Sequence, residues 1–594
     1  MDIVSEEPAA SRLRAFHVRL SPRAASAAAA AAAAALAAWL LLPALTPAHL
    51  EGCTAALAAL GVHLAEGTMA DFDRLQPLNA EYYGLTKLGA VLAVAALVGL
   101  EIGSDLALRL MMWTGFAALL AGSAFLARKW SGARWPFVLA PLLLLPGIFE
   151  SAFIYNDNVP SAGLAAVGLC LLYGRHPLSL AAAGLLLGLA VLTRTDTVLA
   201  CACVPIIIVE RFGRTRRTLA ALATVGACAA LALLGPLAFF QASIFDVLKV
   251  GSAAVRIWNR PTSGLHSLIM GLYFLGLPGL LLAGAGLAAL IRRRDNLAVA
   301  RLLCGPLLLL ALLGDKLWEI RQLLALAPFL CALAAIGLES VYGGADSAVR
   351  LWLRPAVAVI AFLSLAGPST GARMQDGPRV ASGRIWAVPL WRSWQEAPRR
   401  DLATLERVVG SAVPGRPLVL VSDEWNEDRY LHLKLLDAGY TLAGTQPLPQ
   451  PCRPVAERFT RDGRKVLHLR LHHSMVSYWR EIKEERLARW GLPCLDRLGD
   501  ADTLFVATSA RMRSLLPGSG PAVGPRSDDP RRDPAVASLS YGPIVAVPLD
   551  RVRRQQLVAA YRREAESIPG AAGEPLPSAS DAAAASRRRT RFPG

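Results

Sequence analysis

The chain has 594 residues, of which 54% are hydrophobic, and a mean hydropathy of +0.41, so it is more apolar than soluble domains are. This composition excludes an ordinary soluble enzyme and predicts a polytopic α-helical membrane protein. The formal net charge is +17. The basic residues gather in short loops without an aromatic face beside them, so we expect no nucleic-acid partner.

The chain begins with a polar segment, residues 1–23, which we expect to be cytoplasmic. The alanine-rich apolar tract that follows is too long for the h-region of a signal peptide and predicts the first span. Apolar stretches of similar length recur and predict about eleven transmembrane helices within residues 24–368. The expected spans are 24–47, 105–127, 136–154, 159–174, 178–194, 196–210, 217–240, 266–291, 298–314, 321–339 and 351–368.

Segment 86–100 is apolar but only about fifteen residues long, which is short for a span. If it does not cross, the basic loops fall on one side of the membrane, as the positive-inside rule requires. The N-terminus is then cytoplasmic, and the first outer loop covers residues 48–104. The basic loops in question are 127–134, 174–176, 210–217 and 292–295, together with the arginines of residues 1–23.

Residues 369–516 predict a small extracytoplasmic α/β domain. The stretch GRPLVLVSDEWNEDRYLHLKLLDAGY indicates a buried strand, a polar turn and an amphipathic helix, and DTLFVAT and PIVAVPL indicate further strands. Residues 517–594 indicate a linker and a largely flexible tail, because proline, glycine, serine and charge dominate there. If this side of the membrane is oxidising, Cys452 and Cys494 could form a disulfide.

The unusual chemistry lies on the predicted outer side, where ionisable side chains close to the membrane are costly and usually functional. The candidates are the acidic residues Glu51, Asp71, Asp73 and Asp157 and the basic residues Arg256, Arg260, Lys316 and Arg321. Arg194 and Asp196, two positions apart, can neutralise each other.

Carboxylates and cations together suit the transfer of a sugar from a lipid phosphate. A carboxylate takes the proton of the acceptor hydroxyl, and arginine or lysine holds the phosphate that leaves. A divalent metal could help to hold the phosphate, but this chemistry does not require one. We predict no specific metal ligands.

Three segments, in this order along the chain, resemble the GT-C superfamily of integral-membrane glycosyltransferases. They are LALRL at 106–110, GLLLGLAVLTR at 184–194 and RQLLALAPFL at 321–330. The chain is most similar to the branch that holds the dolichyl-phosphate-mannose protein mannosyltransferases and the bacterial aminoarabinose transferase. The resemblance covers about residues 45–370.

The resemblance implies an inverting transferase that uses a polyprenyl-phosphate sugar at the extracytoplasmic face of the inner membrane. Its general base would stand in the first outer loop, where Glu51 matches best. Because the usual acidic pair is missing, Asp71 and Asp73 are rivals. Asp157 would orient the acceptor or a metal. Arg321 matches the cation that holds the phosphate. Lys316 could assist it, and Arg256 and Arg260 are further candidates.

Other functions stay open at this stage. The acceptor could be a glycan, a lipid or a protein. A secondary transporter would predict inverted repeats and helices broken at mid-membrane, which the sequence does not indicate. A polysaccharide polymerase or ligase, and a non-catalytic relative that binds glycolipid, are further alternatives. The abundance of alanine, arginine and glycine indicates a bacterial source.

Overall fold

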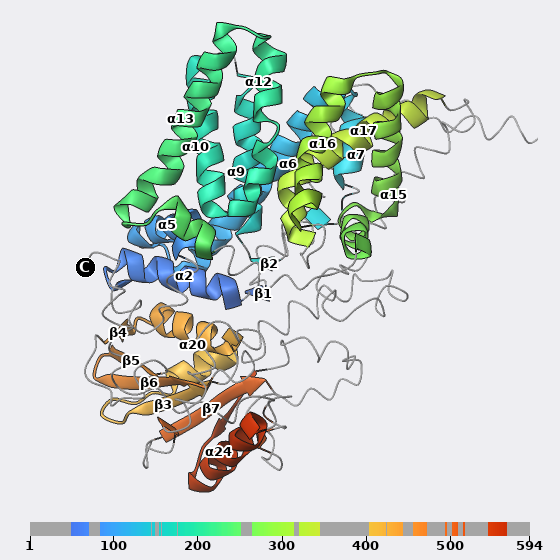
Figure 1. The fold of residues 1–594 in the computed structure, drawn as a ribbon. Coiled ribbons are helices and arrows are strands. Elements are labelled where there is room, and N and C mark those ends of the chain that lie inside the picture. The colour runs from blue at the N-terminus through green and yellow to red at the C-terminus, as the bar shows by residue number, and fades with distance from the viewer. Residues whose placement is uncertain are drawn as a thin grey trace, which may run out of the picture. The chain divides into compact units, whose positions relative to one another are not determined.

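A computed structural model gives the fold of the chain (Figure 1). Residues 47–594 form one unit, distinct from residues 1–46. The structure describes residues 49–50, 52–69, 84–143, 145, 147–148, 154–155, 157–174, 176–250, 264–313, 320–344, 403–422, 425–443, 456–471, 494–495, 502–508, 512, 515–516 and 544–566.

Apolar helices fill the predicted membrane region. They are α2 (Gly52–Ala65), α5 (Leu88–Gly99), α6 (Ser104–Ser131), α7 (Trp135–Leu143), α9 (Asn158–Leu171), α10 (Pro177–Thr193), α11 (Val198–Cys201), α12 (Val204–Phe212), α13 (Arg216–Phe239), α15 (Gly264–Arg292), α16 (Asn296–Leu313) and α17 (Ala327–Gly344), with the 3₁₀ turns η2 (Thr195–Thr197) and η3 (Ile320–Leu326).

Three of the helices described are long and apolar enough to cross a membrane, namely Ser104–Ser131, Arg216–Phe239 and Arg321–Gly343. The count of about eleven spans therefore remains a prediction. Segment 86–100, which we expected not to span, contains α5, a helix of 12 residues. At a rise of about 1.5 Å per residue, α5 is too short to cross the hydrocarbon core of about 30 Å.

Two predicted spans are interrupted in the structure. The stretch 196–210 forms η2, α11 and α12 in succession, and Pro205 stands in the first turn of α12. Proline lacks the N–H that an earlier turn would need, so it marks the start of a new helix. Helix α15 is broken at Gly276, whose φ of 65° is accessible to glycine at little cost, and Pro278 follows.

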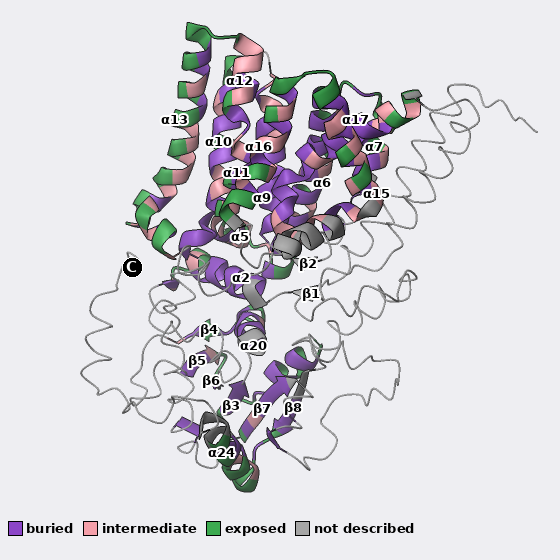
Figure 2. Cartoon of the chain, turned by 45° about the vertical axis from the view of Figure 1, so that its right-hand side comes forward, coloured by how far each residue is buried: buried purple, intermediate pink, exposed green. Residues whose placement is uncertain are grey.

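The helices pack closely where small residues meet. Helices α6 and α9 lie side by side, and a Cβ at Gly115 would be 2.8 Å from the backbone nitrogen of Pro160. Helix α13 packs against α10 but exposes Leu219, Leu231 and Phe239. Figure 2 shows this exposed face along α13. Such a face is suited to contact with lipid chains rather than with water.

Two short strands connect distant parts of this region. Strand β1 (His49–Leu50) pairs in parallel with β2 (Ile154–Tyr155), and Leu50 stands opposite Tyr155. β1 immediately precedes Glu51 in the sequence, and β2 immediately precedes Asn156 and Asp157.

A six-stranded mixed sheet follows in the sequence, with strand order β4-β5-β6-β3-β7-β8. Central β3 runs parallel to β6 and β7, and the other pairs are antiparallel. The elements are β3 (Leu418–Ser422), α20 (Trp425–Asp437), β4 (Thr441–Leu442), β5 (Ala456–Arg461), β6 (Arg464–Arg470), β7 (Asp502–Thr508), β8 (Ile544–Pro548) and α24 (Arg551–Glu566).

Alternation along the strands gives this sheet two different faces. Val419 and Val421 of β3 belong to an apolar core that includes Leu557 and Val558 of α24. Side chains alternate between the two faces along a strand, so Leu420 and Ser422 of β3 lie on the face opposite to α24. Helix α20 covers that second face, so the two helices lie on opposite sides of the sheet (Figure 1).

The predicted strand and amphipathic helix of the C-terminal domain are confirmed as β3 and α20, and DTLFVAT and PIVAVPL form β7 and β8. The sheet includes β8, which lies beyond residue 516, where we expected the domain to end. Cys494 is disulfide-bonded. Cys452, its expected partner, lies outside the described residues.

Candidate functional site

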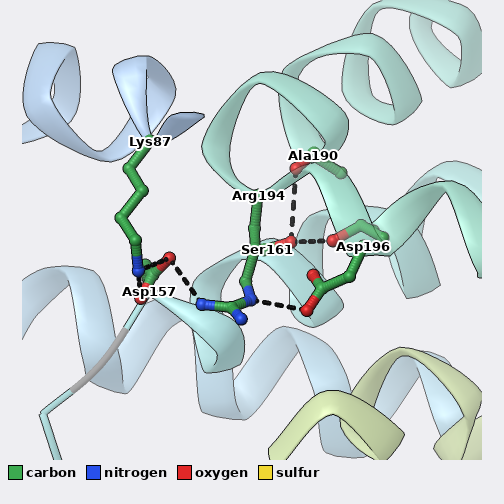
Figure 3. A network of polar contacts seen from close by, with 7 residues as sticks. Lys87, Asp157, Ser161, Ala190, Arg194 and Asp196 are labelled. Atoms are coloured by element: carbon green, nitrogen blue, oxygen red, sulfur yellow. Dashed lines mark hydrogen bonds and ion pairs between the residues drawn. The ribbon is translucent and has the colours of Figure 1, made fainter. Parts of the chain in front are cut away.

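A cluster of buried charges lies where three helices of the membrane region begin or end (Figure 3). Lys87 immediately precedes α5, Asp157 immediately precedes α9, and Arg194 immediately follows α10. The Nζ atom of Lys87 lies 2.8 and 2.7 Å from the two carboxylate oxygens of Asp157. Arg194 donates from Nη1 to Asp157 Oδ2 at 3.0 Å and from Nε to Asp196 Oδ2 at 2.8 Å.

Apolar packing places the two cations. Leu85 and Leu88, which flank Lys87, share a buried cluster with Leu192, two positions before Arg194. Helix α5 comes very close to the end of α10 because Gly89 has no side chain. A Cβ there would lie 2.8 Å from the backbone nitrogen of Thr193. The contact therefore fixes Lys87, two positions before Gly89, relative to Arg194, which directly follows Thr193.

Hydroxyl groups hold the helix ends behind the cluster. Ser161, on the first turn of α9, donates to the carbonyl oxygen of Ala190 at 3.2 Å. Its hydroxyl also contacts that of Thr197, which follows Asp196. Both hydroxyl-bearing residues are buried. These bonds tie the start of α9 to the end of α10, and thus hold Asp157 close to Arg194.

The ion pairs dominate the electrostatics of Asp157, which is 6% exposed. Burial alone would raise the pKa of this carboxyl, but the positive charges of Lys87 and Arg194 outweigh it, so the pKa is lowered from 3.8. Arg321, on η3, lowers it further. Asp157 therefore stays ionised at every physiological pH.

The charges of this cluster do not cancel. Lys87, Arg194 and Arg321 carry three formal positive charges, and Asp157 and Asp196 carry two negative ones. The five groups thus leave an excess of about one positive charge in partly buried surroundings, where screening by salt is weak. Such a group of cations is suited to binding an anion, above all a phosphate, through charge-assisted hydrogen bonds.

Two predicted site residues, Asp157 and Arg321, lie near enough for the charge of Arg321 to lower the pKa of Asp157. The expected neutralisation of Arg194 by Asp196 is confirmed as an ion pair of 2.8 Å. The other candidates lie outside the described residues, and their roles stay predictions. They are Glu51, Asp71, Asp73, Arg256, Arg260 and Lys316.

Lys87 was not among the predicted site residues. The signal that could have identified it is its position as the one charged residue in the apolar segment TKLGAVLAVAALVGL, since a lone charge in such a segment is costly. The second role of Arg194, as a partner of Asp157, has no local signal, because 37 positions separate the two residues.

The described part of the chain contains no group of three or more histidine, cysteine or acidic side chains that could hold a metal ion. Asp157, the acidic residue expected to orient a metal or the acceptor, has its oxygens engaged by Lys87 and Arg194. The arrangement resembles an anion site with its own counter-ion more closely than a metal site.

No family model and no curated protein matches the sequence. Solved structures match the fold, among them two of one protein. The crystal structure of ArnT from Cupriavidus metallidurans in the apo state has a TM-score of 0.52 at 15% identity, over 89% of this chain and 99% of that one. The structure of the same protein bound to undecaprenyl phosphate has a TM-score of 0.50 at 15% identity, over 92% and 98%. The chain thus has a GT-C-like membrane fold.

Proposed function

We propose that this chain, which has the fold of ArnT, is a membrane glycosyltransferase that takes its sugar from a polyprenyl-phosphate donor. The observation that carries the proposal is the positively charged cluster of Lys87, Arg194 and Arg321 around Asp157. A protein of the same fold binds undecaprenyl phosphate. The cluster has the positive charge that a lipid phosphate needs.

In this mechanism the three cations hold the donor phosphate. As the bond between the sugar C1 and the phosphate oxygen breaks, negative charge grows on the leaving polyprenyl phosphate. Cations fixed in advance stabilise that charge without having to reorganise. The arginine guanidinium has five N–H donors, and the ion pairs of Arg194 use two of them. Asp157 would keep Lys87 and Arg194 in place before the donor binds.

The base would come from the first outer loop. We propose Glu51, with Asp71 and Asp73 as alternatives, to accept the proton of the acceptor hydroxyl as its oxygen attacks C1. One displacement then inverts the sugar carbon. Leu50 precedes Glu51 by one position, and Tyr155 precedes Asp157 by two. The pairing of Leu50 with Tyr155 therefore supports Glu51 as the base. Parallel pairing brings the two segments to neighbouring places.

Further parts of the proposal rest on sequence patterns. Lys316, Arg256 and Arg260 would contribute to holding the lipid phosphate. The reaction would take place on the extracytoplasmic side of the inner membrane, with the sheet domain on that side and the N-terminus in the cytoplasm. The acceptor hydroxyl would belong to a glycan, a lipid or a protein.

The test uses the full chain in lipid nanodiscs with a panel of radiolabelled polyprenyl-phosphate sugars and a cell-envelope extract. Transfer by the wild type is expected, together with its loss in one of Glu51→Gln, Asp71→Asn and Asp73→Asn. Asp462→Asn is the matched control, because Asp462 is exposed in a turn with a φ of 47°, which asparagine tolerates.

The outcomes separate the alternatives. Loss of transfer in a single amide variant that still binds polyprenyl phosphate identifies the base. If the wild type binds polyprenyl phosphate but neither transfers nor hydrolyses any donor, the chain is a non-catalytic glycolipid binder. If it does not bind polyprenyl phosphate at all, the anion site has another ligand and the transferase proposal fails.

A further inference from the structure

A chain of buried hydrogen bonds runs from α2 of the membrane region into the sheet. His63 on α2 meets His432 on α20, with their Nε2 atoms 2.7 Å apart. His432 Nδ1 lies 2.7 Å from Oε2 of Glu457 on β5. The same carboxylate oxygen is 3.2 Å from Nδ1 of His468 on β6, and His468 Nε2 is 2.9 Å from the hydroxyl of Ser422.

The register of the sheet explains how these groups meet. Glu457 stands directly opposite His468, and both face α20. The Nη2 atom of Arg470 is 3.8 Å from Oε1 of Glu457, and the ring of Phe459 packs edge-on against His432 with centroids 5.1 Å apart. The side chain of Glu457 is 0% exposed. A buried carboxylate is costly, and apolar packing would stabilise a sheet at least as well.

The donor and acceptor of each of these hydrogen bonds can be assigned by starting from the carboxylate of Glu457. Glu457 only accepts, so His432 donates to it from Nδ1, and a neutral ring then leaves Nε2 of His432 as an acceptor. His63 must therefore donate from its Nε2. Its own Nδ1 accepts from the hydroxyl of Thr68, 2.7 Å away. Every link has one donor and one acceptor.

The row of buried hydrogen bonds ends on α2, a helix that is connected to the candidate site. Helix α2 starts at Gly52, directly after Glu51, and packs on α5, the helix that Lys87 precedes. At Gly61, a Cβ would lie 2.7 Å from Cβ of Val94 on α5. His63 is twelve positions after Glu51, a distance of about 18 Å along a helix. A tilt at the His63 end therefore displaces the end next to Glu51.

A second contact fixes α20 itself. The hydroxyl of Ser104, at the first residue of α6, donates to Asp437 at the last residue of α20. Figure 2 shows α2 and the part of α20 next to it as mostly buried. Helix α20 thus has polar contacts to two helices of the membrane region. Polar contacts of this kind define a single arrangement, whereas apolar faces alone can slide.

We propose that His432 is a positioning residue for sugar transfer, which holds α2 through His63 and so keeps β1, the strand just before Glu51, paired with β2, the strand just before Asp157. The inference rests on the proposed function and deepens it, because it assigns the sheet domain a part in the reaction. Donor binding should depend on the contact less than proton removal does, since two of the three phosphate-holding cations come from α10 and η3, on which α2 does not directly bear. The step that depends most on the contact is proton removal from the acceptor.

The test compares His63→Phe with His63→Gln in the full chain. Phenylalanine keeps the ring and removes both nitrogens, whereas the glutamine amide can still donate to His432. In His63→Phe we expect kcat for transfer to fall at least about tenfold, because a displacement of about 1 Å can have a hundredfold effect on rate. Polyprenyl-phosphate affinity should stay within about twofold. His63→Gln should recover most of the rate.

His468→Gln is the matched control. His468 contacts the same buried carboxylate but does not face α2, so kcat should stay within about threefold of wild type. Equal losses in His468→Gln and His63→Phe would show that only domain stability matters, and would overturn the proposal. Unchanged kcat in His63→Phe would also overturn it.

Amide hydrogen exchange of residues 52–65 separates this inference from the function on which it rests. Faster exchange in His432→Phe and His63→Phe, but not in His468→Gln, shows that the contact holds α2 even if no transfer is found with any donor. In that case the transferase proposal fails, but the contact between the sheet domain and α2 is supported. Exchange that is unchanged in all three variants refutes the positioning role.

Discussion

The Nζ atom of Lys87 lies 2.7 Å from Oδ2 of Asp157, although 70 positions separate the two residues. The pair joins the start of α5 to the start of α9. Arg194 meets the same carboxylate oxygen at 3.0 Å. One carboxylate thus holds two cations from different helices, and the stability and ligand binding of this cluster can be measured separately.

Replacing Lys87 with methionine should weaken the binding of undecaprenyl phosphate. A charge-assisted hydrogen bond contributes about 1.5–3 kcal/mol, so the Kd should rise about ten- to a hundredfold. Equilibrium titration in nanodiscs measures the effect. Lys465→Met, at an exposed position on β6, is the matched control and should bind as the wild type does. Equal affinities for the Lys87 variant and wild type would remove Lys87 from the phosphate site.

Replacing Asp157 with asparagine should destabilise the chain, because Lys87 and Arg194 would then repel each other with no carboxylate between them. Removing one partner of a buried ion pair costs about 3–5 kcal/mol. The pKa of Asp157 is lowered from 3.8 in the folded chain. Its stabilising contribution is therefore complete above pH 3.8 and is lost only as the pH falls through the lower, folded value.

Thermal unfolding of wild type and Asp157→Asn between about pH 5 and pH 9 tests this pH dependence of stability. The difference in Tm should stay constant over the whole range. Added undecaprenyl phosphate should raise the Tm of both proteins by mass action. A difference in Tm that shrinks between pH 7 and pH 5 would mean that Asp157 titrates there, in conflict with its ion pairs.

The close approach at Gly89 predicts a second structural effect. Gly89→Val would force α5 away from Thr193 and should cost about 1–3 kcal/mol, since overpacking of a close contact has this magnitude. Lys87, two positions away, would move with the helix, so phosphate affinity should fall as well. Gly99→Ala, on the same helix, has no atom within 4 Å of the new Cβ. It should leave both stability and phosphate affinity unchanged.

The buried His63 on α2 should make the folded chain less stable in acid. The pKa of His63 is lowered well below 6.5, first by burial and then by His432, while Glu457 acts in the opposite direction. The neutral ring is therefore favoured in the folded chain. Its contribution to stability is complete above pH 6.5 and is lost as the pH falls through the lower, folded value.

Thermal unfolding of wild type and His63→Gln from pH 7.5 to pH 5 measures this contribution. The wild type should lose more Tm than the variant does, because glutamine does not titrate. A second proton on His63 would lie on Nδ1, which could then no longer accept from the hydroxyl of Thr68. Parallel curves for the two proteins would contradict the expected protonation of His63.

Much of the fold could be predicted because apolar length is a strong signal. The span expected at 105–127 is α6, and the strand and helix expected around 415–440 are β3 and α20. Interruptions were missed because average apolarity does not reveal them. Pro205 and Pro278 were the available signals, and each stands next to a break.

The candidate site could be predicted only in part. Asp157 was identifiable as a lone acid between two apolar runs, but its partners come from residues 87 and 194 and depend on packing. The pairing of β1 with β2 involves two residues on each side, too few for a periodic pattern. His63 has no local signal, because its partner His432 is 369 positions away.

The place of β8 in the sheet also bears on how the chain matures. Strand β7 pairs with β3 on one side and with β8 on the other. Until residue 548 has been synthesised and has reached its final compartment, β7 remains an open edge that can pair with another chain. The sheet, and the helix that it presents to α2, can thus be completed only after the ribosome has passed residue 548. Newly made chains should therefore need protection from aggregation during that interval.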